Sequence, residues 1–564
     1  MRMRVLVAAV SVGVVLTIPG THPSAQTVSP VLSAMEDELK RSMEGLRLEN
    51  EPAPYYISYE VADEWGMRAS AQLGALVTNT TGRSRTLWVE VRVGDYSFDS
   101  SRFVTQTRGG GPGSGTVAVS LPLDDDYASL RRQIWLASDT AYKRAVTTFA
   151  RKKAAFQNRV ITEALPDFSQ EAPAQALIPP SDPARTAADW ADRVRDVSAA
   201  FKTNPDVRAS EVWVSSTRAT RYFVNSEGSR VVTPVRSATV QISAEAQADD
   251  GMVVRDAFSA TERELDDLPA ATLLMGRAQE LSERITRLRE APLGEEYTGP
   301  VLLERPASAR FLSQTLVQLM LARRAPDSDN IRMAQIYQSQ VSPFVTRLGL
   351  RVLPDTFSVV DTPSLTEFAG KPVPGAYTVD DEGVPAKDVT LVDKGRLVTL
   401  LTGRTPQRRL LRSNGHSRGG TVQAGVFQLK SGLAVPAAEL KGKYLELLKL
   451  QDKEYGYIIR SIGSEGDGSP EGGPLIFHAV RVYLDGREEI VRGLRFAPVA
   501  FGAFKDIVET SVEQTLHSYR AEGGPIVSLI VPDVLFEELE VQKTTDIAQK
   551  PPVVTSPLLE ATVR

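Results

Sequence analysis

Strand-like and helix-like segments follow one another in this sequence without a regular β–α–β alternation. Residues 55–104 contain short runs of alternating apolar and polar residues, such as Thr86–Val93, separated by turn signals, which predicts antiparallel strands. Segments with apolar residues at helical spacing flank this region, at Pro30–Leu48 and Asp124–Asn158. Strands and helices that lack β–α–β alternation favour the α+β class. We therefore expect a helix-flanked N-terminal sheet region followed by a large β-rich C-terminal domain.

Proline-rich segments mark the expected boundaries between folded units. Pro166–Pro183 is rich in proline and alanine, and a cluster of proline and glycine lies at Pro292–Pro300. The expected organisation is a signal peptide at 1–25, an N-terminal α/β region at 26–168, a central α/β region at 169–295, a C-terminal β-rich domain at 296–545 and a tail at 546–564.

Strands dominate the expected C-terminal domain between Val352 and Leu429, with a hairpin at Val389–Leu401. Helical spacing of apolar residues predicts helices at Ala307–Ala322 and Ala503–Tyr519. His517 is therefore expected to lie on the second of these helices.

The first residues have the pattern of a secretory signal. The basic segment Met1–Arg4 precedes the apolar run Val5–Ile18, and the small residues Ser24 and Ala25 provide a cleavage site. This run is shorter than the ~20 apolar residues needed to span a bilayer, so a membrane anchor is the weaker interpretation. We expect a periplasmic or secreted protein that leaves the membrane after cleavage.

The composition excludes several classes of chemistry. The 564 residues include no cysteine, which rules out disulfides, thiolate metal ligands and cysteine nucleophiles. They include four histidines, so a zinc site made of histidines would need almost all of them. The formal net charge of -5 gives no electrostatic support for nucleic acid as a partner.

The segment Gly415–Gly419, GHSRG, matches the G-x-S-x-G pattern of serine hydrolases. A nucleophile elbow needs a helix directly after the serine, but the following residues predict a loop that enters a strand. Either candidate partner histidine, His478 or His517, can be an ordinary structural residue. A hydrolase that uses Ser417 is therefore kept only as an alternative.

The same loop is rich in arginine. Guanidinium groups bind carboxylates through two parallel hydrogen bonds, so the loop could clamp a peptide carboxylate or an acidic side chain. A solvated surface loop explains the pattern equally well. The candidate residues of a substrate cleft are Arg404, Arg408, Arg409, Arg412, Asn414, His416, Ser417 and Arg418.

Four blocks of the C-terminal region occur in an order and spacing found in a known family. They are GAYTVDDEGVPAKDVTLVDKGRLVTLLTGRTPQRR at Gly375–Arg409, SNGHSRGG at Ser413–Gly420, AVRVYLDGREEIVRGLRF at Ala479–Phe496 and AFKDIVE at Ala503–Glu509. With these blocks the chain resembles the TldD/PmbA (TldE) family of metallopeptidase-related proteins. The resemblance implies a dimer that encloses a cavity for unfolded peptides. In active members it implies a helix with an HExxxH motif, which together with a later cysteine holds zinc for peptide hydrolysis.

The zinc motif of the family is degenerate in this chain. Aligning the family's apolar run with Phe311-Leu312 places Ser313 and Gln314 on the His-Glu pair and Gln318 on the second histidine. Hydroxyl and amide groups do not match the imidazole and carboxylate ligands that zinc prefers. The cysteine ligand is absent from the whole sequence. We therefore expect no catalytic zinc in the family's manner and no other cofactor.

The leading hypothesis is an exported, non-catalytic TldE-like protein that forms the zinc-less, peptide-holding subunit of a proteolytic heterodimer. Its partner would be a TldD-like paralogue that carries the HExxxH motif. Two alternatives stay open. One is a peptidase that works through a relocated metal or Ser417, and the other is a homodimeric exported binding or scaffold protein.

Overall fold

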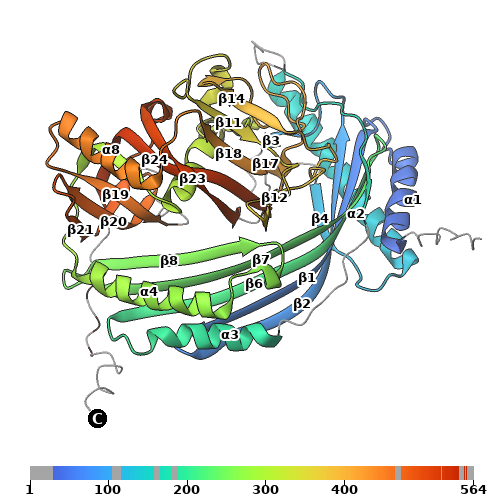
Figure 1. Cartoon of the computed structure of the whole chain (residues 1–564). Helices are drawn as coiled ribbons and strands as arrows, with labels where there is room; N and C mark the ends of the chain where they lie inside the picture. Colours follow the sequence, from blue (N-terminus) through green and yellow to red (C-terminus); the bar gives the residue numbers. More distant parts are fainter. Residues whose placement is uncertain are drawn as a thin grey trace, which may run out of the picture.

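The computed structural model describes residues 29–104, 116–157, 165–178, 188–463, 472–521 and 524–544, together with 550, 552 and 554. The protein belongs to the α+β class, as predicted, with an N-terminal sheet and a large β-rich C-terminal domain (Figure 1). The signal peptide expected at 1–25 lies outside the described residues, as does almost all of the expected tail at 546–564. Within the described part of the chain, no helix is long and apolar enough to cross a membrane.

One long sheet forms the N-terminal half of the molecule. Its strands run in the order β4–β2–β1–β6–β7, and β5 and β8 both pair with the remaining edge of β7. Because β1 and β6 are antiparallel neighbours, the sheet crosses the expected boundary between residues 168 and 169. The strands are β1 (Pro54–Gln72), β2 (Ala75–Val93), β4 (Thr116–Ser120), β5 (Gln175–Leu177), β6 (Val207–Asn225), β7 (Arg230–Gln247) and β8 (Val253–Glu262).

Four helices cover one face of this sheet. On β1, Ile57 and Tyr59 pack against α1 and α2, whereas Ala69 and Ala71 pack against α3. These residues are all odd-numbered, and alternate residues of a strand point to the same side, so the helices lie on that side. The C-terminal domain lies on the opposite face (Figure 1). The helices are α1 (Pro30–Gly45), α2 (Tyr127–Phe156), α3 (Ala188–Ser198) and α4 (Ala271–Glu290).

A closed barrel forms the centre of the C-terminal domain. β9 pairs with both β19 and β24, which closes the path β24–β22–β20–β19–β9 into a ring. Side chains of β9 alternate, so that Val301 packs with residues of α5 and Leu302 with residues of α8. Phe311 of α5 is fully buried against Phe496 and Phe536, with ring centroids 4.8 and 5.7 Å away. The elements are β9 (Tyr297–Leu303), α5 (Ala307–Gln314), α6 (Leu316–Leu319), α8 (Ala437–Leu450), β19 (Tyr455–Ile462), β20 (Leu475–Tyr483), β21 (Glu488–Val491), β22 (Leu494–Phe496) and β24 (Ile526–Lys543).

The barrel sheet continues beyond β24 through β18, β11, β14 and β15. The β14–β15 pairing, with Asp393 opposite Arg396, lies inside the predicted hairpin at Val389–Leu401 and confirms it. The remaining elements of this region are β11 (Phe357–Asp361), β12 (Glu367–Phe368), β13 (Lys371–Pro372), β14 (Val389–Asp393), β15 (Arg396–Leu397), β16 (Ser417–Arg418), β17 (Thr421–Val422) and β18 (Val426–Ser431).

Two predicted helices differ from the structure. The helix predicted at Ala503–Tyr519 is wrong, because the chain forms a short 3-10 helix at Phe501–Asp506 and then strand β23 (Ile507–Arg520), paired with β24. Pairing with a long apolar strand outweighed the local helical spacing. The helix predicted at Ala307–Ala322 is interrupted at Thr315, whose φ of -123° and ψ of -83° separate α5 from α6.

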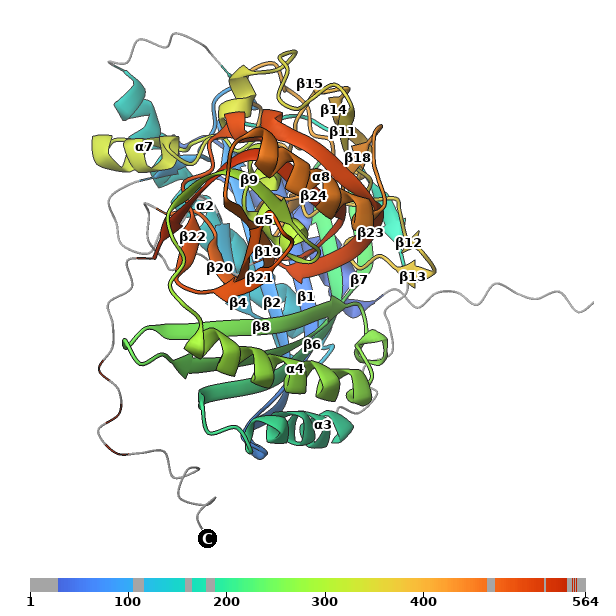
Figure 2. The same cartoon turned by 60° about the vertical axis from the view of Figure 1, so that its left-hand side comes forward.

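Helix α7 (Ile331–Gln338) projects from the side of the molecule (Figure 2). None of its residues is buried, and Ile331 and Ile336 are exposed. The preceding strand β10 (Asp327–Ser328) pairs in parallel with β3 (Phe103–Val104) and so joins this segment to the N-terminal half. Short 3-10 helices complete the chain at Ala199–Phe201, Leu265–Asp267 and Pro343–Thr346.

Candidate functional site

The degenerate motif lies at the end of α5 and in α6. Each of its side chains donates a hydrogen bond to a backbone carbonyl. Ser313 Oγ donates to the Arg310 carbonyl at 2.7 Å, and Gln318 Nε2 donates to the Ser313 carbonyl at 3.1 Å. Gln314 Nε2 donates to the carbonyl of Gly463, just after β19, at 2.6 Å. The three side chains therefore brace the break between the two helices and its contact with the barrel.

Polar residues from α5 itself and from two distant strands, β8 and β23, surround this motif. Arg310, one turn before Ser313, has its guanidinium carbon 5.9 Å from the ring centroid of Tyr519 on β23. The same guanidinium donates to Ser259 Oγ on β8 at 3.4 Å. On β23, the His517 ring stacks on Tyr519 with centroids 6.4 Å apart. The motif thus lies where the C-terminal domain meets the N-terminal sheet.

Burial determines the charge state of these groups. Burial lowers the pKa of the Arg310 and Arg323 guanidinium groups, and neither has a carboxylate partner among the described residues. Burial, with the charge of Arg310 adding to it, lowers the pKa of His517 to about 3, so the imidazole is neutral at pH 7. Burial raises the pKa of Tyr519 to about 12, against the opposing charges of both arginines. The surroundings therefore offer hydrogen-bond donors and positive charge.

These residues do not fit the zinc ion of active family members. Structural and catalytic zinc sites use imidazole, thiolate or carboxylate ligands. Ser313, Gln314 and Gln318 supply hydroxyl and amide groups that already bind backbone carbonyls, and Arg310 adds positive charge beside them. In the described segments, no group of three or more His, Asp or Glu residues could hold a metal ion. We derive no hydrolytic step through a metal from this site.

Arg404, from the loop predicted to line a cleft, is buried at the junction of the two halves. Its guanidinium donates to the Ser169 carbonyl at 2.6 and 3.0 Å and pairs with Glu227 at 2.7 Å. Its guanidinium carbon lies 3.8 Å from the Phe168 ring centroid, and that of Arg92 lies 3.6 Å from the same ring. Arg404 therefore links the C-terminal domain to residues 168–169 and to the N-terminal sheet.

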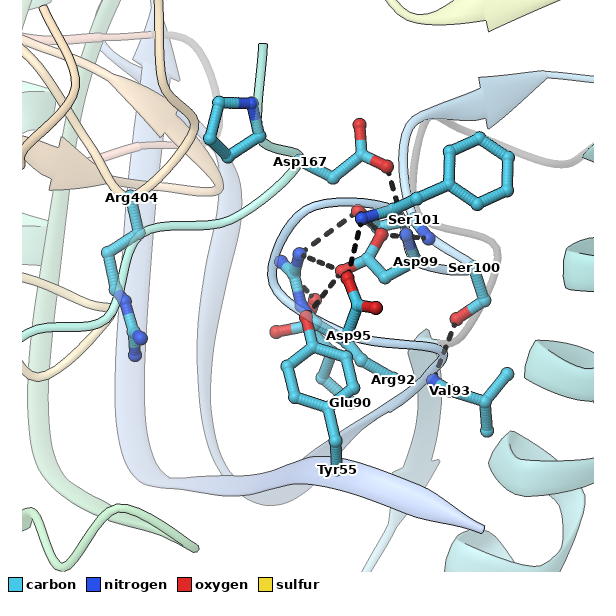
Figure 3. Close-up of polar contacts among 12 residues, drawn as sticks. Tyr55, Glu90, Arg92, Val93, Asp95, Asp99, Ser100, Ser101, Asp167 and Arg404 are labelled. Atoms are coloured by element: carbon cyan, nitrogen blue, oxygen red, sulfur yellow. Dashed lines mark hydrogen bonds and ion pairs between the residues drawn. The ribbon is translucent and has the colours of Figure 1, made fainter. Parts of the chain in front are cut away.

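Arg92 belongs to a buried polar cluster beside Arg404 (Figure 3). The Asp99 carboxylate accepts hydrogen bonds from Tyr55 at 2.7 Å, Arg92 at 3.1 Å and Ser101 Oγ at 2.6 Å. The Asp99 backbone N–H donates to the Asp167 carboxylate at 3.0 Å. This network holds the segment that presents Phe168 to both arginines, so its role is structural.

His416 and Ser417 are buried but do not form a catalytic pair. The His416 ring is engaged on both sides, with Nε2 3.2 Å from the Asp361 carboxylate and Nδ1 2.9 Å from Asn414 Oδ1. Ser417 donates its backbone N–H to Asp380, and within the described residues no hydrogen bond joins its hydroxyl to a histidine. A β16–β17 hairpin, rather than a helix, follows the serine. The geometry lacks the features of a nucleophile elbow.

The other arginines of the loop divide between the surface and the interior. Arg408, Arg409 and Arg412 are exposed, and Arg412 pairs with Glu171 at 3.1 Å. Arg418 is buried and donates to a backbone carbonyl at 3.1 Å. Contact of this loop with a peptide stays a prediction.

Residues 296–543 match the PmbA/TldA metallopeptidase C-terminal domain. The C-terminal domain of this chain belongs to the TldD/PmbA family. A metalloprotease from Archaeoglobus fulgidus is 27% identical over 157 residues, which span 26% of this chain and 32% of that protein. The match thus covers about a third of that relative, and the family likeness is concentrated in the C-terminal domain.

Three solved structures share the fold of most of the chain. TldE from Thermococcus kodakarensis has a TM-score of 0.59 at 15% identity and covers 90% of this chain and 100% of its own. A candidate modulator of a DNA gyrase from Thermotoga maritima has a TM-score of 0.58 at 15% identity. The match covers 86% of this chain and 96% of that chain. A second candidate modulator of DNA gyrase, from Bacteroides thetaiotaomicron, has a TM-score of 0.58 at 12% identity. The match covers 91% of this chain and 98% of that chain. The TM-scores show that this chain shares its fold, including the N-terminal sheet, with these three structures.

The sequence analysis proposed the motif residues, which stay a prediction, but it missed their surroundings. Arg310, Arg323 and Tyr519 come from different elements, and only the folded chain brings them together. His517 was expected on a helix. Alternation along residues 507–520 is the signal that would have placed His517 and Tyr519 on one face of a strand.

Proposed function

We propose that this protein is an exported, zinc-less subunit of the TldD/PmbA type that holds extended peptide for a catalytic partner. The partner is a relative that carries an intact HExxxH motif. The observation that carries the proposal is the composition of the motif: Ser313, Gln314 and Gln318 bind backbone carbonyls, and cationic Arg310 stands beside them.

Strand β23 supports a role in holding peptide. Among the described strands it pairs only with β24, apart from an isolated bridge between Ser511 and Val435. An extended peptide can add to such an edge through main-chain hydrogen bonds. The edge adjoins His517 and Tyr519, so an added peptide would lie beside the former zinc motif.

Helix α7 supports the presence of a partner. Short helices gain most of their stability from packing an apolar face, yet α7 buries none of its residues. Ile331 is 78% exposed and Ile336 is 45% exposed. A second subunit that covers these two side chains would account for the helix.

Metal analysis together with co-purification tests the proposal. After incubation with zinc and desalting, the purified mature protein is expected to retain far less than one zinc per chain. It is expected to form a stable complex with the HExxxH-bearing relative, and Ile331→Ser with Ile336→Ser is expected to weaken that complex. Leu450→Ser, which changes an exposed leucine on α8, is the matched control and should leave the complex intact.

Two results would contradict the proposal. One zinc held tightly by each chain and required for peptide hydrolysis would make this protein a peptidase in its own right. An exclusive and stable homodimer would favour the scaffold interpretation. Export is tested separately by fractionating cells and sequencing the mature N-terminus, which is expected to follow Ala25.

A further inference from the structure

Arg310 and Arg323 are half-buried and, unlike Arg92, Arg221 and Arg404, have no acidic partner among the described residues. Arg92 pairs with Asp99, Arg221 with Glu60 and Asp381, and Arg404 with Glu227. Arg310 instead has one long hydrogen bond to Ser259, and Arg323 has one to the Val422 carbonyl at 3.4 Å. Burying a charge without a partner costs free energy of folding. The presence of two such arginines is therefore best explained by a ligand that is not part of this chain.

Other groups beside the two arginines also lack partners. Arg323 Nε and His517 Nε2 are buried and form no hydrogen bond with any described residue. The Arg310 guanidinium carbon lies 5.9 Å from the Tyr519 ring centroid, and the charges of both arginines act on the Tyr519 phenol. The charge of Asp361 also acts on Tyr519, but the Asp361 carboxylate is already bound to His416 and to backbone N–H groups. The site is therefore a cluster of unsatisfied donors with positive charge.

We propose that the place of the zinc site in this chain is an anion site, in which Arg310 and Arg323 bind a carboxylate with help from Tyr519. Planar guanidinium groups match the geometry of a carboxylate and bind it through charge-assisted hydrogen bonds. The charge of the ligand is thus opposite to that in an active family member, because this site attracts an anion where the relative holds a zinc cation. The charge that excludes zinc is the same charge that selects the ligand.

A peptide is the source of the carboxylate, and this step rests on the proposed peptide-holding function. β23 carries Tyr519 and has a free edge over residues 513–520 among the described strands. A peptide added to that edge would bring its C-terminal carboxylate or an acidic side chain to Arg310. Free anions such as acetate share the same chemistry and are distinguished by the experiment below.

Titration calorimetry with matched peptides tests the site on the full mature chain. One flexible decapeptide is used as the free acid, as the C-terminal amide, and as the amide with one internal glutamate, and acetate is used alone. The free acid or the glutamate peptide is expected to bind about tenfold tighter than the plain amide, as a charge-assisted hydrogen bond would give. Arg310→Gln and Arg323→Gln are each expected to remove that preference. Arg351→Gln, which removes an exposed arginine paired with Asp355, should leave it unchanged.

The outcomes separate this inference from the proposed function. Equal affinity for the acid, the glutamate peptide and the plain amide, or a preference that survives both substitutions, overturns the anion site and leaves peptide holding intact. Binding of acetate that both substitutions abolish, without binding of any peptide, supports the anion site and overturns the peptide-holding function. Thermal melting of each variant serves as the folding control, and neither substitution is expected to lower the midpoint, because each removes an unpaired charge.

Discussion

Arg404 and Arg310 are both arginines withdrawn from solvent, but only Arg404 has a carboxylate partner. Replacing Arg404 by methionine leaves the mostly buried Glu227 uncompensated, and such a change costs about 3–5 kcal/mol of unfolding free energy. Arg310→Met removes a charge that has no partner, so we expect no loss of stability. Urea unfolding of the two variants beside Arg351→Met, an exposed control, measures the difference. Similar losses for Arg404→Met and Arg310→Met would contradict this assignment of their roles.

His517 makes stability depend on pH. Burial lowers its folded pKa to about 3 from an unfolded value of 6.5, so the unfolded state binds a proton first as the pH falls. Its contribution to stability is therefore complete above pH 6.5 and declines as the pH falls toward 3. His517→Gln removes this pH-dependent contribution. Between pH 7.5 and pH 5, the unfolding free energy of the wild type should therefore fall by about 2 kcal/mol more than that of the variant. Urea midpoints at both pH values test this, and parallel losses would show that His517 is not buried as a neutral group.

At the scale of elements, local patterns were sufficient at a hairpin in which a short turn joins two paired strands. The hairpin predicted at Val389–Leu401 is present, since β14 pairs with β15 there. The prediction failed at Ile507–Arg520, where a strand replaces a helix. There the deciding interaction is pairing with β24, whose apolar residues supply a partner that the segment alone does not reveal.

The candidate site likewise depends on contacts between segments that are distant in the sequence. The alignment of Ser313, Gln314 and Gln318 with the zinc motif uses one segment of sequence and stays a prediction. Arg310 lies on the same helix as Ser313, whereas Arg323 follows α6 and Tyr519 is on β23, so a motif in one segment does not reveal them. The break at Thr315, which separates α5 from α6, also has no strong signal in the sequence. Long-range packing, rather than local propensity, makes this site.

At the scale of the whole molecule, the curved N-terminal sheet is a platform for the C-terminal domain. Helices occupy one face, and polar residues on the other face pair across the junction. Arg221 on β6 lies 3.3 Å from Asp381 and donates to the Asp380 carbonyl at 3.1 Å. With Arg404 and Glu227, these contacts form ion pairs across the junction, which act together with the β3–β10 pairing to fix the relative position of the two halves. Arg310, one turn before Ser313, donates to Ser259 Oγ of the N-terminal sheet, so the position of the two halves also affects the surroundings of Ser313, Gln314 and Gln318.

Coupling between the halves can be measured by calorimetry. We expect the wild type to unfold in a single transition, because buried ion pairs of this kind link the N-terminal sheet to the barrel. Arg221→Gln with Arg404→Gln removes both links and should split the transition in two, with the sheet and the barrel melting separately. Arg412→Gln is the matched control, since Arg412 comes from the same loop and pairs with Glu171 at the surface, where an ion pair contributes little. A double variant that still melts in one transition, only at a lower temperature, would show that apolar contacts such as those of Phe223 with Val379 couple the halves instead.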